Sequence, residues 1–145
     1  MTSAASSSAL SRIDAISAPK AIAAAAAGAL IVNLVLWLIG LAAGGDFETV
    51  DNGKAMTVAP GGVVVLTLIP LIVGLTAAAL LAVKWPVFIR IAQVLGAIAA
   101  LGTVALTIKA DFDGPSTVAL ALMHVVVALA VIAGLEAVRN GRLVR

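Results

Sequence analysis

Cysteine and tyrosine are absent from the 145-residue chain, and aromatic residues make up only 3% of it. Without cysteine the chain cannot form a disulfide, exchange thiols, or hold a metal or haem through sulfur. The scarcity of aromatic rings also argues against a large stacking surface for a cofactor. Charged residues are rare as well, at 11% of the chain against about 25% in soluble domains. These absences exclude thiol chemistry and count against a water-soluble domain.

Hydrophobic residues are what the chain has in excess, at 63% against about 45–50% in soluble domains. A small domain in water leaves too much of its surface exposed to hide this much apolar material, so the lipid bilayer is the natural solvent. The net charge of +2 is spread over basic residues that flank the apolar runs. Because they form no single patch, the sequence counts against nucleic acid as a partner.

Four apolar segments are long enough to cross a membrane. A hydrocarbon core of about 30 Å needs roughly 20 residues at about 1.5 Å rise each. Clusters of glycine and proline separate the segments. The sequence therefore predicts an all-α membrane protein, a four-transmembrane-helix bundle over residues 20–139, with spans at about 21–43, 61–83, 87–109 and 117–138.

The two ends of the chain are predicted to be tails. Residues 1–19 are rich in Ser and Ala and predict a disordered segment, and residues 140–145 predict a short basic tail. The first apolar run has 23 residues, which is longer than the roughly 7–15 of a signal-peptide core. We expect this run to be retained as a helix.

Basic residues predict the orientation. Seven Lys and Arg fall on the side of the two termini and two on the other, and cytoplasmic loops carry the excess of these residues. The sequence thus predicts a multi-pass plasma-membrane protein with both termini cytoplasmic. The seven are Arg12, Lys20, Lys84, Arg90, Arg139, Arg142 and Arg145, and the two are Lys54 and Lys109.

The connection between the first two spans predicts a β-hairpin outside the cytoplasm. Asn52-Gly53 lies in its middle, and Asn-Gly favours the tight turn in which both central residues have positive φ. The alternative is a mobile acidic loop. A hairpin turning at Asn52-Gly53 has the cross-strand pairs Asp51–Lys54, Thr49–Met56 and Phe47–Val58.

Each span carries one face of small and polar residues at helical spacing. Membrane helices associate through close approach at small residues and through hydrogen bonds, so we expect these faces to turn inward. Along the chain they are Ala26, Ala29, Asn33, Leu36 and Gly40; Val63, Thr67, Pro70, Gly74 and Ala77; Gln93, Gly96, Ala100, Thr103 and Thr107; and Thr117, Ala121, His124, Ala128 and Val131.

One polar residue of each face lies at a similar depth. Asn33, Thr67, Thr103 and His124, called the polar layer below, lie roughly 9–15 Å from the outer helix ends. They predict a hydrogen-bonded network between helices. A site for a ligand, lipid or proton is the other interpretation, because ionisable groups inside membranes are often functional. One His without Cys or a deep carboxylate does not make a metal site.

Catalytic and transport motifs are missing. No Asp or Glu lies deep in a span, as a proton-coupled exporter requires, and no selectivity-filter motif is present. The chain has no nucleophile elbow, phosphate loop or zinc-binding His-Glu motif. We therefore predict a protein that is not an enzyme and has no cofactor.

Three features of the chain resemble those of a known family. They are the four-helix plan, the Val-Ala-Pro-Gly stretch that ends the outer loop and, most specifically, the segment Ala-Leu-Met-His-Val-Val-Val at residues 121–127. In these features the chain resembles an uncharacterised family of small four-helix membrane proteins from high-GC actinobacteria. The bias toward Ala, Val and Gly suits such a genome. The resemblance implies no activity and directs attention to His124.

Two functions remain open on the sequence. The favoured one is a non-catalytic structural or accessory protein that packs with a membrane partner or with itself as a homo-oligomer, indicated by the small faces and by Gly40-x-x-x-Gly44. The alternative is a module that binds or transports a small apolar or lipid-like molecule through the polar layer around His124. A tight bundle favours the first function, and a cavity at the polar layer favours the second.

Overall fold

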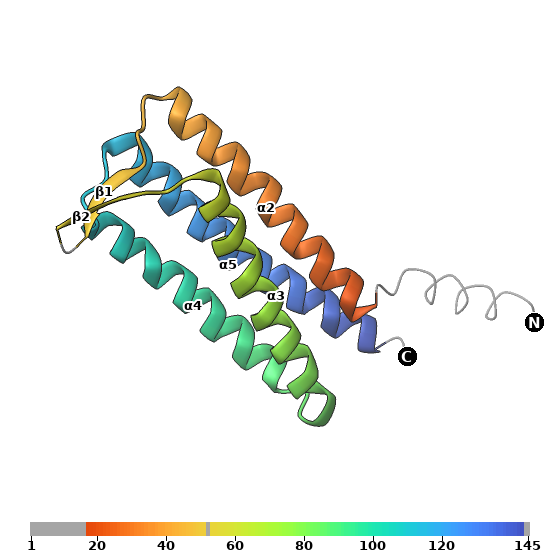
Figure 1. The fold of residues 1–145 in the computed structure, drawn as a ribbon. Coiled ribbons are helices and arrows are strands. Elements are labelled where there is room, and N and C mark those ends of the chain that lie inside the picture. Colours follow the sequence, from red (N-terminus) through yellow and green to blue (C-terminus); the bar gives the residue numbers. More distant parts are fainter. Residues whose placement is uncertain (1–16, 52, 144–145) are drawn as a thin grey trace, which may run out of the picture.

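The predicted fold, four long helices with a small hairpin, is confirmed. A computed structural model describes residues 17–51 and 53–143. Each of its four helices is long and apolar enough to cross a membrane. The elements are, in order, α2 (Ala18–Ala42), β1 (Glu48–Asp51), β2 (Lys54–Thr57), α3 (Pro60–Lys84), α4 (Phe88–Lys109) and α5 (Gly114–Leu143) (Figure 1).

Parts of three predictions lie outside the described residues: the tail over 1–16, Asn52 of the turn, and residues 144–145. Three helix bounds differ from the expected ones by three residues or more, and one of them is the start of α5 at Gly114. Helix α2 begins at Ala18, since Pro19 favours the first turn of a helix. Helix α5 continues to Leu143 because no proline follows the apolar run to stop it.

Local sequence explains where the helices begin and end. Pro60 occupies the first position of α3. A backbone N–H at this position has no acceptor within the helix, so a proline, which lacks the N–H, is favourable there. Trp85 precedes Pro86 and is extended, with φ −133° and ψ 93°, so it ends α3. Asp113 precedes α5, and its carboxylate accepts a hydrogen bond from the backbone N–H of Ser116 at 2.7 Å.

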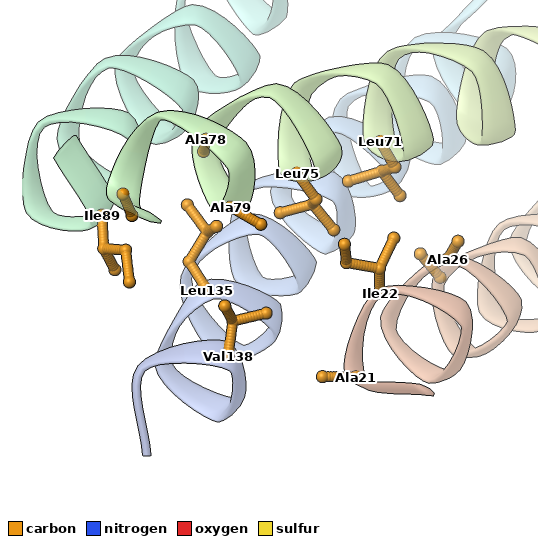
Figure 2. Packing of buried hydrophobic residues seen from close by; sticks show 12 residues of the cluster. Ala21, Ile22, Ala26, Leu71, Leu75, Ala78, Ala79, Ile89, Leu135 and Val138 are labelled. Carbon is orange, nitrogen blue, oxygen red and sulfur yellow. The ribbon is translucent and has the colours of Figure 1, made fainter. Parts of the chain in front are cut away.

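The helices pack unevenly. Helix α5 lies against both α2 and α4, and α3 lies mainly against α2, while α3 and α4 touch much less (Figure 1). Figure 2 shows the core, in which Leu71 and Leu75 of α3 meet Ile22 of α2 and Leu135 of α5. The core therefore fills the α2 side of α3, whereas α4 joins it at the α3–α4 loop end, through Ile89.

A second cluster closes the hairpin end of the bundle around Phe47, which is buried although it precedes a surface strand. Its φ of 56° is unusual for an aromatic residue, so the surrounding packing must hold it. The ring lies on Gly40, where a Cβ would stand 2.6 Å from Cζ of Phe47. The Trp37 ring lies 5.9 Å from that of Phe47 and donates from Nε1 to the carbonyl oxygen of Val58 at 2.9 Å.

The hairpin has the predicted register. Asp51 pairs with Lys54 and Thr49 with Met56, and the N–H of Val58 donates to the carbonyl oxygen of Phe47 at 2.9 Å. Gly53 has the positive φ, 77°, that the turn requires. The segment is tied to the α4–α5 connection through bonds from Thr49 to Ala110 O, from Asp46 N to Asp113 Oδ2 and from Phe47 N to Ser116 Oγ. These ties make it an ordered hairpin rather than a mobile loop.

Candidate functional site: a cavity between two helices

A cavity of about 660 Å³ lies between α3 and α4, with α5 behind it. Pockets for small molecules have volumes of about 300–1,000 Å³. Leu66 of α3 and Leu95 of α4 line the cavity and are 69% and 61% exposed, so it opens sideways between these two helices. In a membrane this side faces lipid.

Small residues explain why the helices leave this space. A Cβ on Gly96 of α4 would lie 2.8 Å from Cγ1 of Val131, and one on Gly134 of α5 would lie 2.9 Å from Cβ of Ala25. These close approaches bring α4 and α2 onto α5. Gly74 of α3 lines the cavity, and a Cβ there would meet nothing within 4 Å. Nothing comparable draws α3 and α4 together along this wall.

All four residues of the polar layer line this cavity. Helix α2 contributes Asn33 alone, so the side chain of Asn33 reaches between α3 and α5 to the wall. Counted along the helices at about 1.5 Å per residue, the four lie roughly 9–15 Å from the hairpin-side helix ends. Leu75, Val131 and Leu135 line the other end. The four polar residues thus lie in the half of the cavity nearer the hairpin, next to the apolar Val58 and Val63, and the half toward the α3–α4 loop is apolar.

The expected network across four helices is wrong for two of its members. Asn33 Nδ2 donates to Thr67 Oγ1 at 2.9 Å and joins α2 to α3. His124 Nδ1 instead bonds the carbonyl oxygen of Leu120 at 2.7 Å, and Thr103 Oγ1 donates to that of Ala99 at 2.7 Å. Both partners lie four residues back in the same helix, where a polar side chain finds an acceptor without crossing the cavity.

The predicted inward faces hold better in α2 and α4 than in α3. Asn33 and Gly40 of α2 and Gln93 and Ala100 of α4 are buried as expected. In α3 the prediction is wrong beyond Thr67. The face that meets the core lies one residue further along than the predicted one, and Pro70 and Gly74 of the predicted face line the cavity. Buried are Leu71, Leu75 and Ala78, whereas Pro70, Gly74 and Ala77 are exposed.

A charged cluster that the sequence analysis missed lies at the α3–α4 loop end of α4 and α5. Glu136 Oε2 accepts from Arg90 Nη1 at 3.1 Å and from Gln93 Nε2 at 3.3 Å, and its other oxygen pairs with Arg139. Arg139 lies one helical turn from Glu136, a spacing at which side chains on a helix meet. Arg90 is 46 residues away, and only the fold brings it close. Within residues 17–51 and 53–143, no charged residue lines the cavity itself.

Asp113 organises the opposite end, where its carboxylate receives the backbone N–H groups of Asp46 and Ser116. Hydrogen bonding from Ser116, followed by that from Asp46, lowers the pKa of Asp113 below its usual value. The ionised carboxylate therefore joins the start of α5 to the segment that enters the hairpin.

The site offers binding groups and little for catalysis. Over residues 17–51 and 53–143, no three His, Asp or Glu side chains gather in a way that could hold a metal ion. The one hydrogen bond of His124 goes to a backbone carbonyl, so the ring is not paired with an acid or a nucleophile in the described chain. The arrangement can accommodate an apolar body and meet one polar group.

Comparison with known proteins adds a family and no activity. Residues 14–141 match a family of unknown function. No curated protein and no solved structure matches the chain.

Proposed function

The chain belongs to that family, DUF6069, and on this premise we propose that it is a membrane protein that binds a small, mainly apolar molecule between α3 and α4. The cavity carries the proposal: it has the volume of a small-molecule site, opens toward lipid and is lined by the polar layer. A binding site of this kind was the alternative interpretation of the sequence.

The structure weakens the argument for the interpretation that the sequence favoured, namely a protein that packs with a partner or with itself. Gly40 indicated an external helix contact, yet the Phe47 ring and Ala119 of α5 cover it. The small residues Gly96 and Gly134 likewise support contacts within the bundle. Most of the small residues that suggested a partner thus make contacts between helices of the same chain.

The proposed function is not catalytic. In the part of the chain that the structure describes, the polar side chains at the cavity are an amide, two hydroxyls and one imidazole, with no carboxylate or amine beside them. Binding, storage or passage of an intact molecule fits this set, because general acid–base chemistry needs a partner of suitable pKa beside the ring.

The proposed location is the plasma membrane with both termini cytoplasmic, from the excess of Lys and Arg on the terminal side. The polar end of the cavity then lies in the outer leaflet. Single cysteines at Ser6 and Asn52 of this cysteine-free chain test the orientation. An impermeant thiol reagent added to intact cells is expected to label position 52 alone. Labelling of position 6 alone overturns the orientation.

Photolabelling tests the binding function. The protein in lipid nanodiscs is exposed to hexadecyl-chain probes that carry a diazirine on the chain, and the labelled residues are mapped by mass spectrometry. We expect labels on cavity-lining residues of α3, α4 and α5, and competition by unlabelled hexadecanol. Labels spread evenly over the lipid-facing surface, without competition, would contradict the function.

Two glycines provide a matched pair of variants. Both lie in helices and have open space where a Cβ would stand, but Gly74 lines the cavity and Gly28 of α2 does not. Gly74→Leu fills the cavity and should abolish the specific labels. Gly28→Leu adds the same side chain elsewhere and should leave them unchanged.

A further inference from the structure

We infer that the occupant of the cavity is an uncharged lipid alcohol, whose hydroxyl meets the Asn33–His124 end and whose chain extends toward Leu75 and Leu135. This inference rests on the proposed function and adds the chemical class of the ligand. Four observations support it: the unsatisfied acceptor of Asn33, the tautomer of the His124 ring, the lack of charge among the described lining residues and the polarity gradient along the cavity.

The first observation is the amide of Asn33. This residue is 2% exposed, and its nitrogen is engaged by Thr67. Its Oδ1 is buried and has no hydrogen-bond partner among the described residues. A buried acceptor left without a partner is unfavourable, and a membrane has no water to supply one. Because Oδ1 is itself buried, a ligand hydroxyl at this level removes the deficit when the amide of Asn33 turns toward the cavity.

The second observation is the tautomer of His124. A carbonyl oxygen only accepts, so the 2.7 Å contact with Leu120 O requires the proton on Nδ1. In the neutral ring Nε2 is then an acceptor, and no described residue donates to it. The donor of Thr103 is committed to Ala99 in the same way. Among the described residues two acceptors, Asn33 Oδ1 and His124 Nε2, therefore stand beside one uncommitted donor, the O–H of Thr67, and a hydroxyl group, which both donates and accepts, matches this set.

The third observation concerns charge. None of the described residues that line the cavity is Asp, Glu, Lys or Arg. A carboxylate, phosphate or ammonium head brought to this depth would be desolvated without a partner of opposite charge, which is strongly unfavourable. A hydroxyl loses far less and is compensated by one or two hydrogen bonds.

The gradient fixes the direction of the ligand. The polar layer lies toward the hairpin, and the apolar residues Leu75, Val131 and Leu135 lie toward the α3–α4 loop. A hydroxyl at the first end leaves the chain among apolar side chains along the rest of the cavity. The side opening beside Leu66 and Leu95 allows entry from lipid without crossing the hairpin.

Three probes that differ only in the head group test the inference in nanodiscs at about pH 9, where palmitate is ionised although the membrane raises the pKa of its carboxyl group. They are hexadecanol, its methyl ether, which keeps the acceptor oxygen but has no donor, and palmitate, which is ionised. Each competes against the diazirine probe. We expect hexadecanol to bind about three- to tenfold more tightly than the ether, the ratio of one net hydrogen bond, and palmitate to bind more weakly than both.

Variants assign the preference to the polar layer. His124→Leu and Asn33→Leu should reduce the ratio between alcohol and ether toward one, while binding of the ether shows that the cavity persists. Thr76→Val, on an exposed position of α3 outside the cavity, should keep the wild-type ratio.

The outcomes separate the two proposals. Equal binding of alcohol and ether overturns the alcohol as the ligand class and leaves the binding function standing. Tighter binding of palmitate overturns the uncharged head group. Absence of specific binding by all three probes, with no labels in the cavity, overturns both the inference and the proposed function.

Discussion

Replacing Gly40 by alanine should destabilise the bundle, because the added methyl group has no room. It would stand 2.6 Å from Cζ of Phe47 and 2.9 Å from Cβ of Ala119. The ring cannot turn away freely, since Phe47 is 1% exposed and its N–H is tied to Ser116. Inserting a methyl group into such packing typically costs about 1–3 kcal/mol.

Alanine also favours a helix over glycine by about 0.5–1 kcal/mol, which works in the opposite direction. Gly28→Ala in the same helix isolates this effect, because a Cβ there meets nothing within 4 Å. The difference in unfolding free energy between the two variants should therefore be about 1–3 kcal/mol. Reversible unfolding in mixed micelles, followed by helical circular dichroism, measures it. Equal stability of the two variants would refute the packing of Phe47 onto α2.

Three further predictions address the polar layer and the hairpin end. A double-mutant cycle with Asn33→Leu and Thr67→Val should give a coupling in the free energy of unfolding of about 0.6–1.7 kcal/mol, the range for hydrogen bonds between membrane helices. Additive effects of the two substitutions would contradict the 2.9 Å bond between these side chains. The lowered pKa of Asp113 means that its stabilising effect is complete above the ordinary carboxyl pKa of about 3.9 and is lost as the pH falls through the lowered folded-state pKa. Acidification through that range should increase proteolysis of the hairpin, and Asp113→Asn should remove this dependence on pH, whereas Asp111→Asn should not. Gly53→Val should speed amide exchange in β1 and β2, because a β-branched residue resists the φ of 77°, and unchanged exchange would show that the turn tolerates it.

Much of the fold follows from local sequence. Each span is recognised by its length and apolarity because only a helix satisfies all its backbone groups within lipid. The hairpin register follows from Asn52-Gly53, since the turn fixes which residues of the two strands face each other. The polar layer is also found this way, because depth in the membrane is counted along each helix from its own end.

What the sequence alone determined, then, is which segments span the membrane, how the hairpin pairs and that four polar residues lie at one depth. Tertiary structure decided which of these four polar residues contact one another and which face a cavity. Whether two polar groups at equal depth touch depends on the rotation and separation of their helices, which Gly96 and Gly134 set through contacts with residues far away in the chain. These contacts draw α2 and α4 onto α5 and leave α3 and α4 apart. Asn33 and Thr67 therefore meet, while His124 and Thr103 face a cavity and bond to their own helices. Periodicity cannot reveal that difference, because it records the direction in which a side chain points and not the distance to what it faces.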